Sequence, residues 1–337
     1  MTRSLDKDIL AHLKADDLNR IYEDISTLLT DQPENELLEI EFLGKSHPLQ
    51  PGVNYLRDGT AVAIPKLRLA QAFFVARQKL KGYQNSGSIN DSKIGHATAV
   101  LLLMDPEHLT AANTRKRLLI STLEGNGPHE SILRREKQFV DSLLTSRLHR
   151  HTKSPVLWSH RRWLLHLFVA HDVFVDPQHD IKNIVMVAGT RHPRNYTAWH
   201  HARFLLDRHP TFAEPVAIDV KDFCLKNHTD ISCWSFLVHA ICKIENKENR
   251  TKLCSSIVAE VLHISDSLRW TNESVWVFLR SIAVTGLIGD QQFESFLAIN
   301  EKLVSITPED SSQWRTLEGA RRWCEKYRLS SESNVAE

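Results

Sequence analysis

Histidine and cysteine, the residue types that most often bind metals or act as nucleophiles, are the first candidates for chemistry in this sequence. The chain has 18 histidines and 5 cysteines. It contains no His-Glu-x-x-His motif and no Cys-x-x-Cys pair, the spacings of common zinc sites. Each cysteine lies among apolar residues of an expected helix, which favours a buried and inert thiol. We therefore expect the histidines on helix faces or at interfaces, and no metal bound by this chain.

Charge is almost balanced, with 42 Lys and Arg against 41 Asp and Glu in 337 residues, a net charge of +1. This balance argues against non-specific nucleic-acid binding, which requires a basic excess. The turn Gly125-Asn126-Gly127-Pro128 lacks the Lys-Ser/Thr of a phosphate-binding loop. No apolar run approaches the roughly 18 residues of a membrane span, and the first residues do not resemble a signal peptide. We therefore expect a cytoplasmic protein with no membrane span and no nucleic-acid partner.

The elements that must position any site are mainly helical, because apolar residues recur at three- and four-residue intervals over most of the chain. The first helix is expected from about Asp8 to Leu29. Residues 31–65 hold four prolines and three glycines, so we expect an irregular segment with short extended pieces at 37–40 and 61–64. The predicted division is N-terminal helices and an irregular accessory segment at 1–90, helical repeats at 91–328, and a disordered tail at 329–337.

A repeat centred on tryptophan runs through most of the chain. Its key positions are Trp158, Trp199, Trp234 and Trp276, with a degenerate copy at Ala112 and a weak one at Trp314. Neighbouring key positions are 35 to 46 residues apart, the length of one helical hairpin. The sequence therefore predicts an all-α fold, a right-handed α-solenoid of helical hairpins that forms a TPR-like α-α superhelix.

Each copy places polar residues beside its tryptophan on one helix face. The residues of this signature, expected at packing or partner interfaces, are Trp158, His160, Arg161, Arg162, Trp199, His200, Arg203, Trp276 and Arg280. An arginine four residues after a tryptophan is expected to place its guanidinium over or beside that indole ring. The tryptophans are expected to be core residues between stacked hairpins. The arginines have two interpretations: they bind the neighbouring repeat, or they line a surface for an acidic partner. The charged segment 132–137 is expected to be a solvated helix face.

The repeat resembles that of protein prenyltransferase α subunits. Asn195, Tyr196, Trp199 and Arg203 match the Asn-Tyr-x-x-Trp-x-x-x-Arg pattern of that family, and residues 153–163 and 272–280 are similar to further copies. The resemblance covers about residues 95–320 and is greatest to the branch of repeat-containing α-like chains that serve a geranylgeranyltransferase. It implies a non-catalytic α subunit wrapped around a β subunit of the Rab geranylgeranyltransferase type.

The resemblance also implies the chemistry and the residues that support it. The β subunit would hold the catalytic zinc and the isoprenoid pocket, and this chain would bind no cofactor. Lys153, Arg194 and Tyr196 match positions that approach the prenyl diphosphate in the family, where such groups stabilise the charge that develops on the leaving group. Pro155 stands where the family has tyrosine. The implied reaction transfers a geranylgeranyl group to a C-terminal cysteine of an acceptor protein.

A second interpretation comes from a different class of protein. A solenoid adaptor without enzymatic activity would bind a peptide or protein partner through the same repeats. In the third copy Val238 replaces the arginine, and such drift is compatible with an adaptor. The two hypotheses differ in whether Tyr196 and the repeat arginines face a β subunit or an extended peptide.

Overall fold

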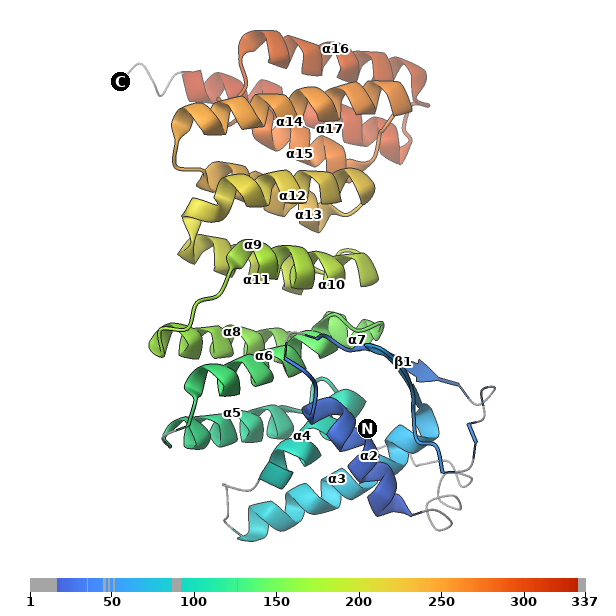
Figure 1. The fold of residues 1–337 in the computed structure, drawn as a ribbon. Coiled ribbons are helices and arrows are strands. Elements are labelled where there is room, and N and C mark those ends of the chain that lie inside the picture. Colours follow the sequence, from blue (N-terminus) through green and yellow to red (C-terminus); the bar gives the residue numbers. More distant parts are fainter. Residues whose placement is uncertain are drawn as a thin grey trace. The chain divides into compact units, whose positions relative to one another are not determined.

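The computed structural model describes residues 17–332, apart from 35, 45, 46, 48, 51, 87–91 and 126. The chain divides into two compact units, Met1–Val175 and Asp176–Glu337. Helices make up most of each unit (Figure 1), so the prediction of a predominantly α-helical protein is confirmed.

A small sheet in the first unit corrects the expectation of irregular backbone across residues 31–65. β1 (Glu39–Leu43) pairs in parallel with β3 (Ala61–Pro65), and β2 (Leu56–Asp58) pairs antiparallel with the other edge of β3. The side chains of Ile40 and Ile64 are fully buried because one face of the sheet meets the core. The extended piece expected at 61–64 lies in β3. The piece expected at 37–40 begins two residues before β1.

The first unit continues as a set of packed helices. They are α2 (Leu18–Thr30), α3 (Lys66–Ser86), α4 (Ser92–Met104), α5 (Leu109–Leu123), α6 (His129–Leu144), α7 (His149–Thr152) and α8 (Pro155–Ala170). The Asp17 carboxylate caps α2 by accepting a hydrogen bond from the backbone N–H of Arg20 at 3.1 Å. Residues 8–16 of the expected first helix lie outside the described residues.

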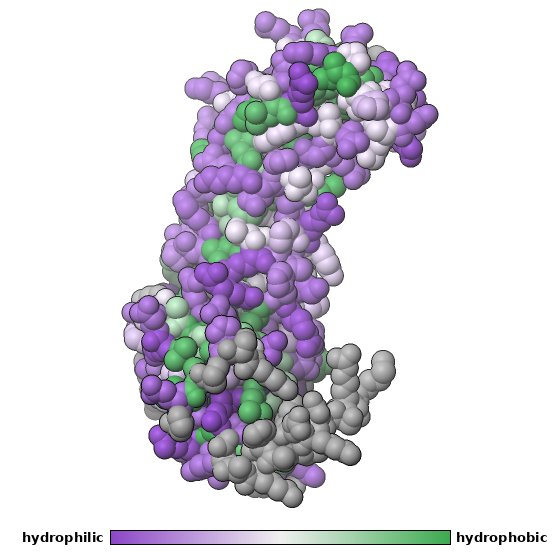
Figure 2. Space-filling view, turned by 90° about the vertical axis from the view of Figure 1, so that its right-hand side faces the viewer, coloured by the Kyte–Doolittle hydropathy of each residue, from purple (hydrophilic) through white to green (hydrophobic). Residues whose placement is uncertain are grey.

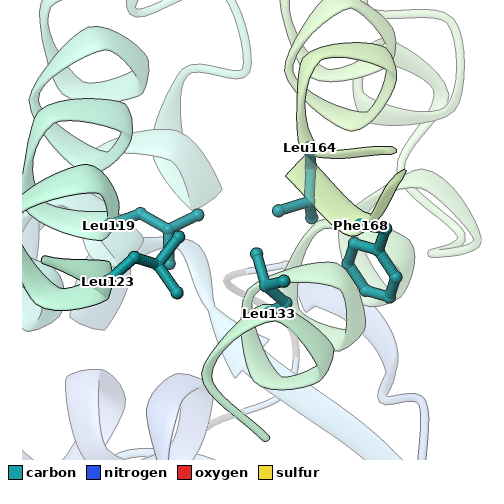
Figure 3. Close-up of a cluster of buried hydrophobic side chains, with 5 residues drawn as sticks. All are labelled: Leu119, Leu123, Leu133, Leu164 and Phe168. Carbon is teal, nitrogen blue, oxygen red and sulfur yellow. The ribbon is translucent and has the colours of Figure 1, made fainter. Parts of the chain in front are cut away.

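One part of the core of the first unit joins three of these helices. Figure 3 shows Leu119 and Leu123 of α5, Leu133 of α6, and Leu164 and Phe168 of α8 converging on one another. All five side chains are buried. Their spacing of four residues on α5 and again on α8 places each pair on one helix face, so the helical period of the sequence produces this contact directly.

The second unit consists of successive helices joined by short connections. They are α9 (Pro177–Asp180), the π-helical segment Ile181–Val185, α10 (Met186–Arg191), α11 (Tyr196–Arg208), the 3₁₀ turn Pro210–Phe212, α12 (Ala213–Lys226), α13 (Ile231–Lys243), α14 (Lys247–Leu268), α15 (Glu273–Ala283), α16 (Asp290–Ile306) and α17 (Ser312–Glu332).

These helices form two layers within the second unit. α11 packs on α13, α13 on α15, and α15 on α17, which we call layer A. α12 packs on α14 and α14 on α16, which we call layer B (Figure 1). The tryptophans of this unit's repeats stand on layer A helices, so each repeat contributes one helix to each layer. The hairpin repeat read from the sequence therefore corresponds to stacked hairpins in this unit.

Much of the surface of the protein is polar. Most of the surface visible in Figure 2 is hydrophilic, and its hydrophobic side chains form small separate patches. Within the described ranges, no helix combines the length and the apolar character needed to cross a membrane. α17 extends to Glu332, four residues into the expected tail, and residues 333–337 lie outside the described residues.

Candidate functional site

The repeat tryptophans lie in the core and make the same hydrogen bond in three copies. The indole N–H of Trp158 donates to the carbonyl of Thr152 at 2.8 Å, and that of Trp276 donates to the carbonyl of Trp270 at 2.8 Å. In the third copy the indole of Trp234 donates in the same way to the residue six positions earlier, at 3.0 Å. Each indole therefore fixes the turn that precedes its own helix, in addition to filling the core.

The copy at Trp199 differs in this respect. Its side chain is fully buried, but its indole N–H has no hydrogen-bond partner among the described residues. The ring packs instead against Phe223 and Phe236, with ring centroids 5.4 and 5.3 Å away. A Cβ added at Gly189 would lie 3.6 Å from the indole nitrogen and 3.3 Å from the Phe223 ring, so glycine permits this close packing.

The turns before the repeat helices are linked to one another by side chains. Asp230 caps α13 by accepting from the backbone N–H of Ser232 at 2.9 Å, and it also accepts from the backbone N–H of Arg194 at 2.8 Å. Asn272 precedes α15, but its amide donates to the carbonyl of His228 at 2.8 Å rather than capping its own helix. Each bond joins one repeat to the next, because the partners lie 36 to 44 residues apart.

A similar link occurs in the first unit. The hydroxyl of Ser154 accepts from the backbone N–H of Leu157, which caps α8, and donates to the carbonyl of Pro106 at 3.1 Å. Pro155 is the first residue of α8, where proline is favoured because that position needs no N–H donor. The departure of Pro155 from the expected tyrosine therefore has a local structural role.

The three residues expected near a diphosphate are exposed. Lys153 follows α7 in the first unit. Arg194 and Tyr196 lie in the turn before α11 and at its first position in the second unit, and Tyr196 has 73% of its surface exposed. Arg194 has a positive φ of 60°, an unusual backbone for a non-glycine residue. The Asp230 carboxylate, which binds the backbone N–H of Arg194, stabilises this turn.

The repeat arginines of the second unit contact the following layer A helix. The guanidinium of Arg203 donates to the hydroxyl of Ser235 at 2.9 Å and lies 5.8 Å from the Phe236 ring centroid. The guanidinium of Arg280 lies 4.8 Å from the centroid of Trp323 on α17. The expectation that each guanidinium stacks on the indole four residues earlier is therefore corrected for both, since the stacked ring belongs to the next helix.

These contacts define one exposed surface, the A face, on the outer side of layer A. It includes His200, Arg203, Ser235, Val277, Arg280, Arg315 and Trp323. Val238, the replacement for the repeat arginine in the third copy, lies half-buried on α13. Arg162, the equivalent residue in the first unit, is also half-buried.

The first unit contains a buried charged network that the sequence analysis missed. Arg115 binds Glu136 with two hydrogen bonds, of 3.0 Å from Nε and 2.5 Å from Nη2, and His160 Nε2 lies 2.9 Å from Glu136 Oε1. Nearby along α6, Asp141 accepts from Arg161 Nε at 2.6 Å and lies 2.7 Å from Lys137. Burial alone would raise the pKa of Glu136, but the adjacent Arg115 and His160 hold it well below its usual range.

This network corrects the expectation of a solvated face at 132–137. Glu136 is buried, and Arg161 and His160 are fully buried on the facing side of α8. These residues hold α5, α6 and α8 together through charge. A signal existed in the sequence, because Glu136 and Val140 are four residues apart on the apolar side of α6.

Burial keeps one histidine and two cysteines in their uncharged forms. Burial lowers the pKa of His151 to about 4, although its Nε2 lies 2.8 Å from the carbonyl oxygen of Leu103. Burial raises the pKa of the Cys254 thiol to about 12 and that of Cys324 to about 11, so both are protonated at neutral pH. Cys242 is exposed, which corrects the expectation that every thiol is buried. Within the described part of the chain, no three His, Cys, Asp or Glu side chains group as metal ligands.

Comparison with known proteins finds similarity to ECM9. Residues 157–261 match the family described as the ECM9 middle domain. The chain is also similar to Protein ECM9 of Saccharomyces cerevisiae (strain ATCC 204508 / S288c), with 30% identity over 171 residues. That match covers 50% of this chain and 45% of the yeast protein, so the chain aligns with less than half the length of this relative.

These matches correct the prenyltransferase resemblance. The family model and the curated relative are both ECM9, and neither is a prenyltransferase α subunit. The predictions of a prenyltransferase subunit, an enzyme, geranylgeranyl transfer, a heterodimer and a β-subunit partner are therefore wrong. The diphosphate roles of Lys153, Arg194 and Tyr196 depended on that resemblance. The chain is similar to ECM9, and its second unit is a layered helical repeat that exposes arginines on the A face.

Proposed function

We propose that the second unit is a scaffold that binds an acidic segment of another protein along its A face. The observation that carries this proposal is that three arginines on that face lack a close carboxylate partner among the described residues. Arg203, Arg280 and Arg315 form no ion pair with a carboxylate among the described residues. Unneutralised guanidinium groups on one surface favour a partner that supplies negative charge.

Several other arginines of the chain are neutralised by a carboxylate of the same chain. Arg115 and Arg161 each bind a buried carboxylate, and Arg328 lies 2.9 Å from Asp290. Asp207, one turn after Arg203 on α11, lies 2.8 Å from Lys243 and 3.1 Å from His239, and its charge reaches Arg203 only from beyond ion-pair distance. The A face therefore places three arginines without a close carboxylate partner in the described part of the chain on helices α11, α15 and α17 of layer A.

The type of partner follows from the composition of the face and of the chain. Arginine and tryptophan are the residue types that contribute most to protein interfaces, and helical repeats bind partners along one layer of helices. A net charge of +1 does not favour nucleic acid. We therefore propose a protein partner. The proposal includes helical repeats across residues 91–328, a right-handed superhelix within the second unit, and action in the cytoplasm.

Site-specific photo-crosslinking in cells tests the proposal. A benzophenone amino acid replaces Ser235 on the A face, and in a matched variant it replaces Ile218, which is 45% exposed on α12 of layer B. We expect the Ser235 position to form a discrete crosslinked product that mass spectrometry identifies as one protein. Equal crosslinking at both positions, or crosslinking from Ile218 alone, would exclude the A face as the binding surface.

A further inference from the structure

A hollow on the A face lies between α15 and α17. It has a volume of about 240 Å³ and is lined by Glu273, Val277, Arg280, Arg315, Thr316 and Gly319. A Cβ added at Gly319 would have no heavy atom within 4 Å, so this part of the hollow is open. By contrast, the contact between α11 and α13 is bridged by the Arg203–Ser235 hydrogen bond and the Asp207–Lys243 ion pair.

Two guanidinium groups border this hollow with donors to spare. The Nε of Arg280 is buried and has no hydrogen-bond partner among the described residues. Arg315 donates from one Nη to the carbonyl of Asp310 at 2.6 Å, which leaves its other N–H groups available. A carboxylate that accepts from these guanidinium groups would form charge-assisted hydrogen bonds, which are stronger than neutral ones.

An aromatic surface adjoins the hollow. The Trp323 ring lies beneath the Arg280 guanidinium, and the Trp323 and Tyr327 ring centroids are 4.4 Å apart. These two side chains are 38% and 39% exposed. They offer a partially exposed apolar platform beside a cationic hollow, and such a combination suits a charged side chain next to an apolar one.

We propose that this hollow binds the carboxylate of an aspartate or glutamate from a partner protein, with a neighbouring aliphatic side chain packed on Trp323 and Tyr327. The carboxylate accepts hydrogen bonds from Arg280 and Arg315. Glu273 also lines the hollow, and its repulsion grows with the negative charge of the ligand, so a single carboxylate is preferred over a phosphodiester chain. This inference rests on the proposed function and identifies the recognised group.

The test uses two fluorescein-labelled peptides and fluorescence anisotropy with the full chain. One peptide contains Leu-Glu-Leu within a Gly/Ser sequence, and the other contains Leu-Gln-Leu. We expect the glutamate peptide to bind at least roughly tenfold more tightly, since a hydrogen bond to a charged group is stronger than one to a neutral amide. Equal binding of the two peptides, or no saturable binding of the glutamate peptide below about 1 mM, would overturn the proposal.

Two variants locate the binding in the hollow. Gly319→Leu fills the open space, and it favours the α17 helix, so a loss of binding cannot come from unfolding of that helix. Arg315→Glu reverses one charge. Each should weaken the glutamate peptide by roughly tenfold or more. The matched controls are Gly82→Leu on α3, where an added Cβ also meets nothing within 4 Å, and Arg117→Glu, an exposed arginine on α5. Both should leave binding unchanged.

The outcomes separate this inference from the proposed function. If a single-stranded oligonucleotide displaces the peptide, or if Gly319→Leu has no effect, the hollow is not a carboxylate site. If Ser235 still crosslinks to a partner in the Gly319→Leu chain, the A face binds elsewhere and only this inference fails. If Ser235 forms no crosslink while the glutamate peptide binds as expected, the proposed function fails and the hollow remains a carboxylate site.

Discussion

The indole N–H groups of the repeat tryptophans provide a direct test of their structural role. Trp276 and Trp199 are both fully buried in the second unit, but only the indole of Trp276 has a hydrogen-bond acceptor among the described residues. Replacing each by phenylalanine removes the N–H and part of the ring. In the Trp276→Phe variant this deletes a hydrogen bond and leaves the carbonyl of Trp270 without that donor. In the Trp199→Phe variant it removes a buried donor that had no acceptor.

The expected difference follows from these environments. The Trp276 hydrogen bond contributes a net of about 0.5–1.5 kcal/mol, and removing an unsatisfied buried N–H regains about 1–3 kcal/mol. Trp199 contacts two aromatic rings and Trp276 contacts one, so Trp199→Phe loses somewhat more packing. We therefore expect Trp276→Phe to lower the free energy of unfolding by about 1–2 kcal/mol more than Trp199→Phe does.

Urea denaturation followed by far-ultraviolet circular dichroism measures this difference. The comparison requires equal denaturant slopes in the two variants, because a changed slope would indicate a changed unfolded state. Equal midpoints, or a lower midpoint for Trp199→Phe, would refute the argument that the indole hydrogen bond stabilises the turn before each repeat helix.

Three further predictions concern the buried network, a buried histidine and the links between repeats. Asp141→Asn removes the carboxylate that binds the fully buried Arg161, and it should lower the free energy of unfolding in urea titrations by about 3–5 kcal/mol. A double variant with Asp141→Leu and Arg161→Met should recover most of that loss, because it leaves no buried charge without a partner. The pKa of His151 is lowered to about 4 by burial, so the neutral imidazole stabilises the fold above pH 6.5 and this contribution is lost as the pH falls towards 4. In His151→Gln, the pH dependence of the free energy of unfolding from urea titrations should therefore be smaller by up to about 3 kcal/mol across that range. An unchanged pH dependence would contradict the assignment. Asn272→Ala deletes the 2.8 Å hydrogen bond to the carbonyl of His228 and should cost about 1 kcal/mol. This cost should be visible as a lower melting temperature than that of Asn113→Ala, a control at an exposed position on α5.

The sequence was sufficient to predict the helical hairpins because their signals are local. Tryptophans about one hairpin apart and apolar residues at helical spacing indicate both the helices and the faces that they bury. Trp234 and Trp276 show this, since each is buried at the same place in its hairpin. Strand β1 was harder to predict, because it pairs with β3 across about 20 intervening residues. Strand β2 pairs with β3 in a local hairpin through Gly59 and Thr60, which the sequence analysis missed.

The partners of charged side chains could not be predicted for the same reason. Arg280 is four residues from Trp276 in sequence, yet its guanidinium lies over Trp323 on another helix. Glu136 stands in a charged run that suggests solvent exposure, yet Arg115 and His160 surround it in the core. A pattern along one helix gives the face on which a side chain lies, but the neighbouring helix determines what the side chain contacts. The resemblance to a prenyltransferase α subunit was wrong because helical repeats of similar spacing occur in proteins of different function.

The central claim is that the A face of the second unit binds an acidic protein segment through its unpaired arginines. The most direct measurement is the crosslinking yield from a benzophenone at Ser235, compared between the otherwise natural chain and the same chain carrying Arg203→Glu. The guanidinium of Arg203 lies against this position, so charge reversal should abolish a crosslink to an acidic partner while leaving the helical content unchanged. An equal yield of the same product from both chains would contradict the claim.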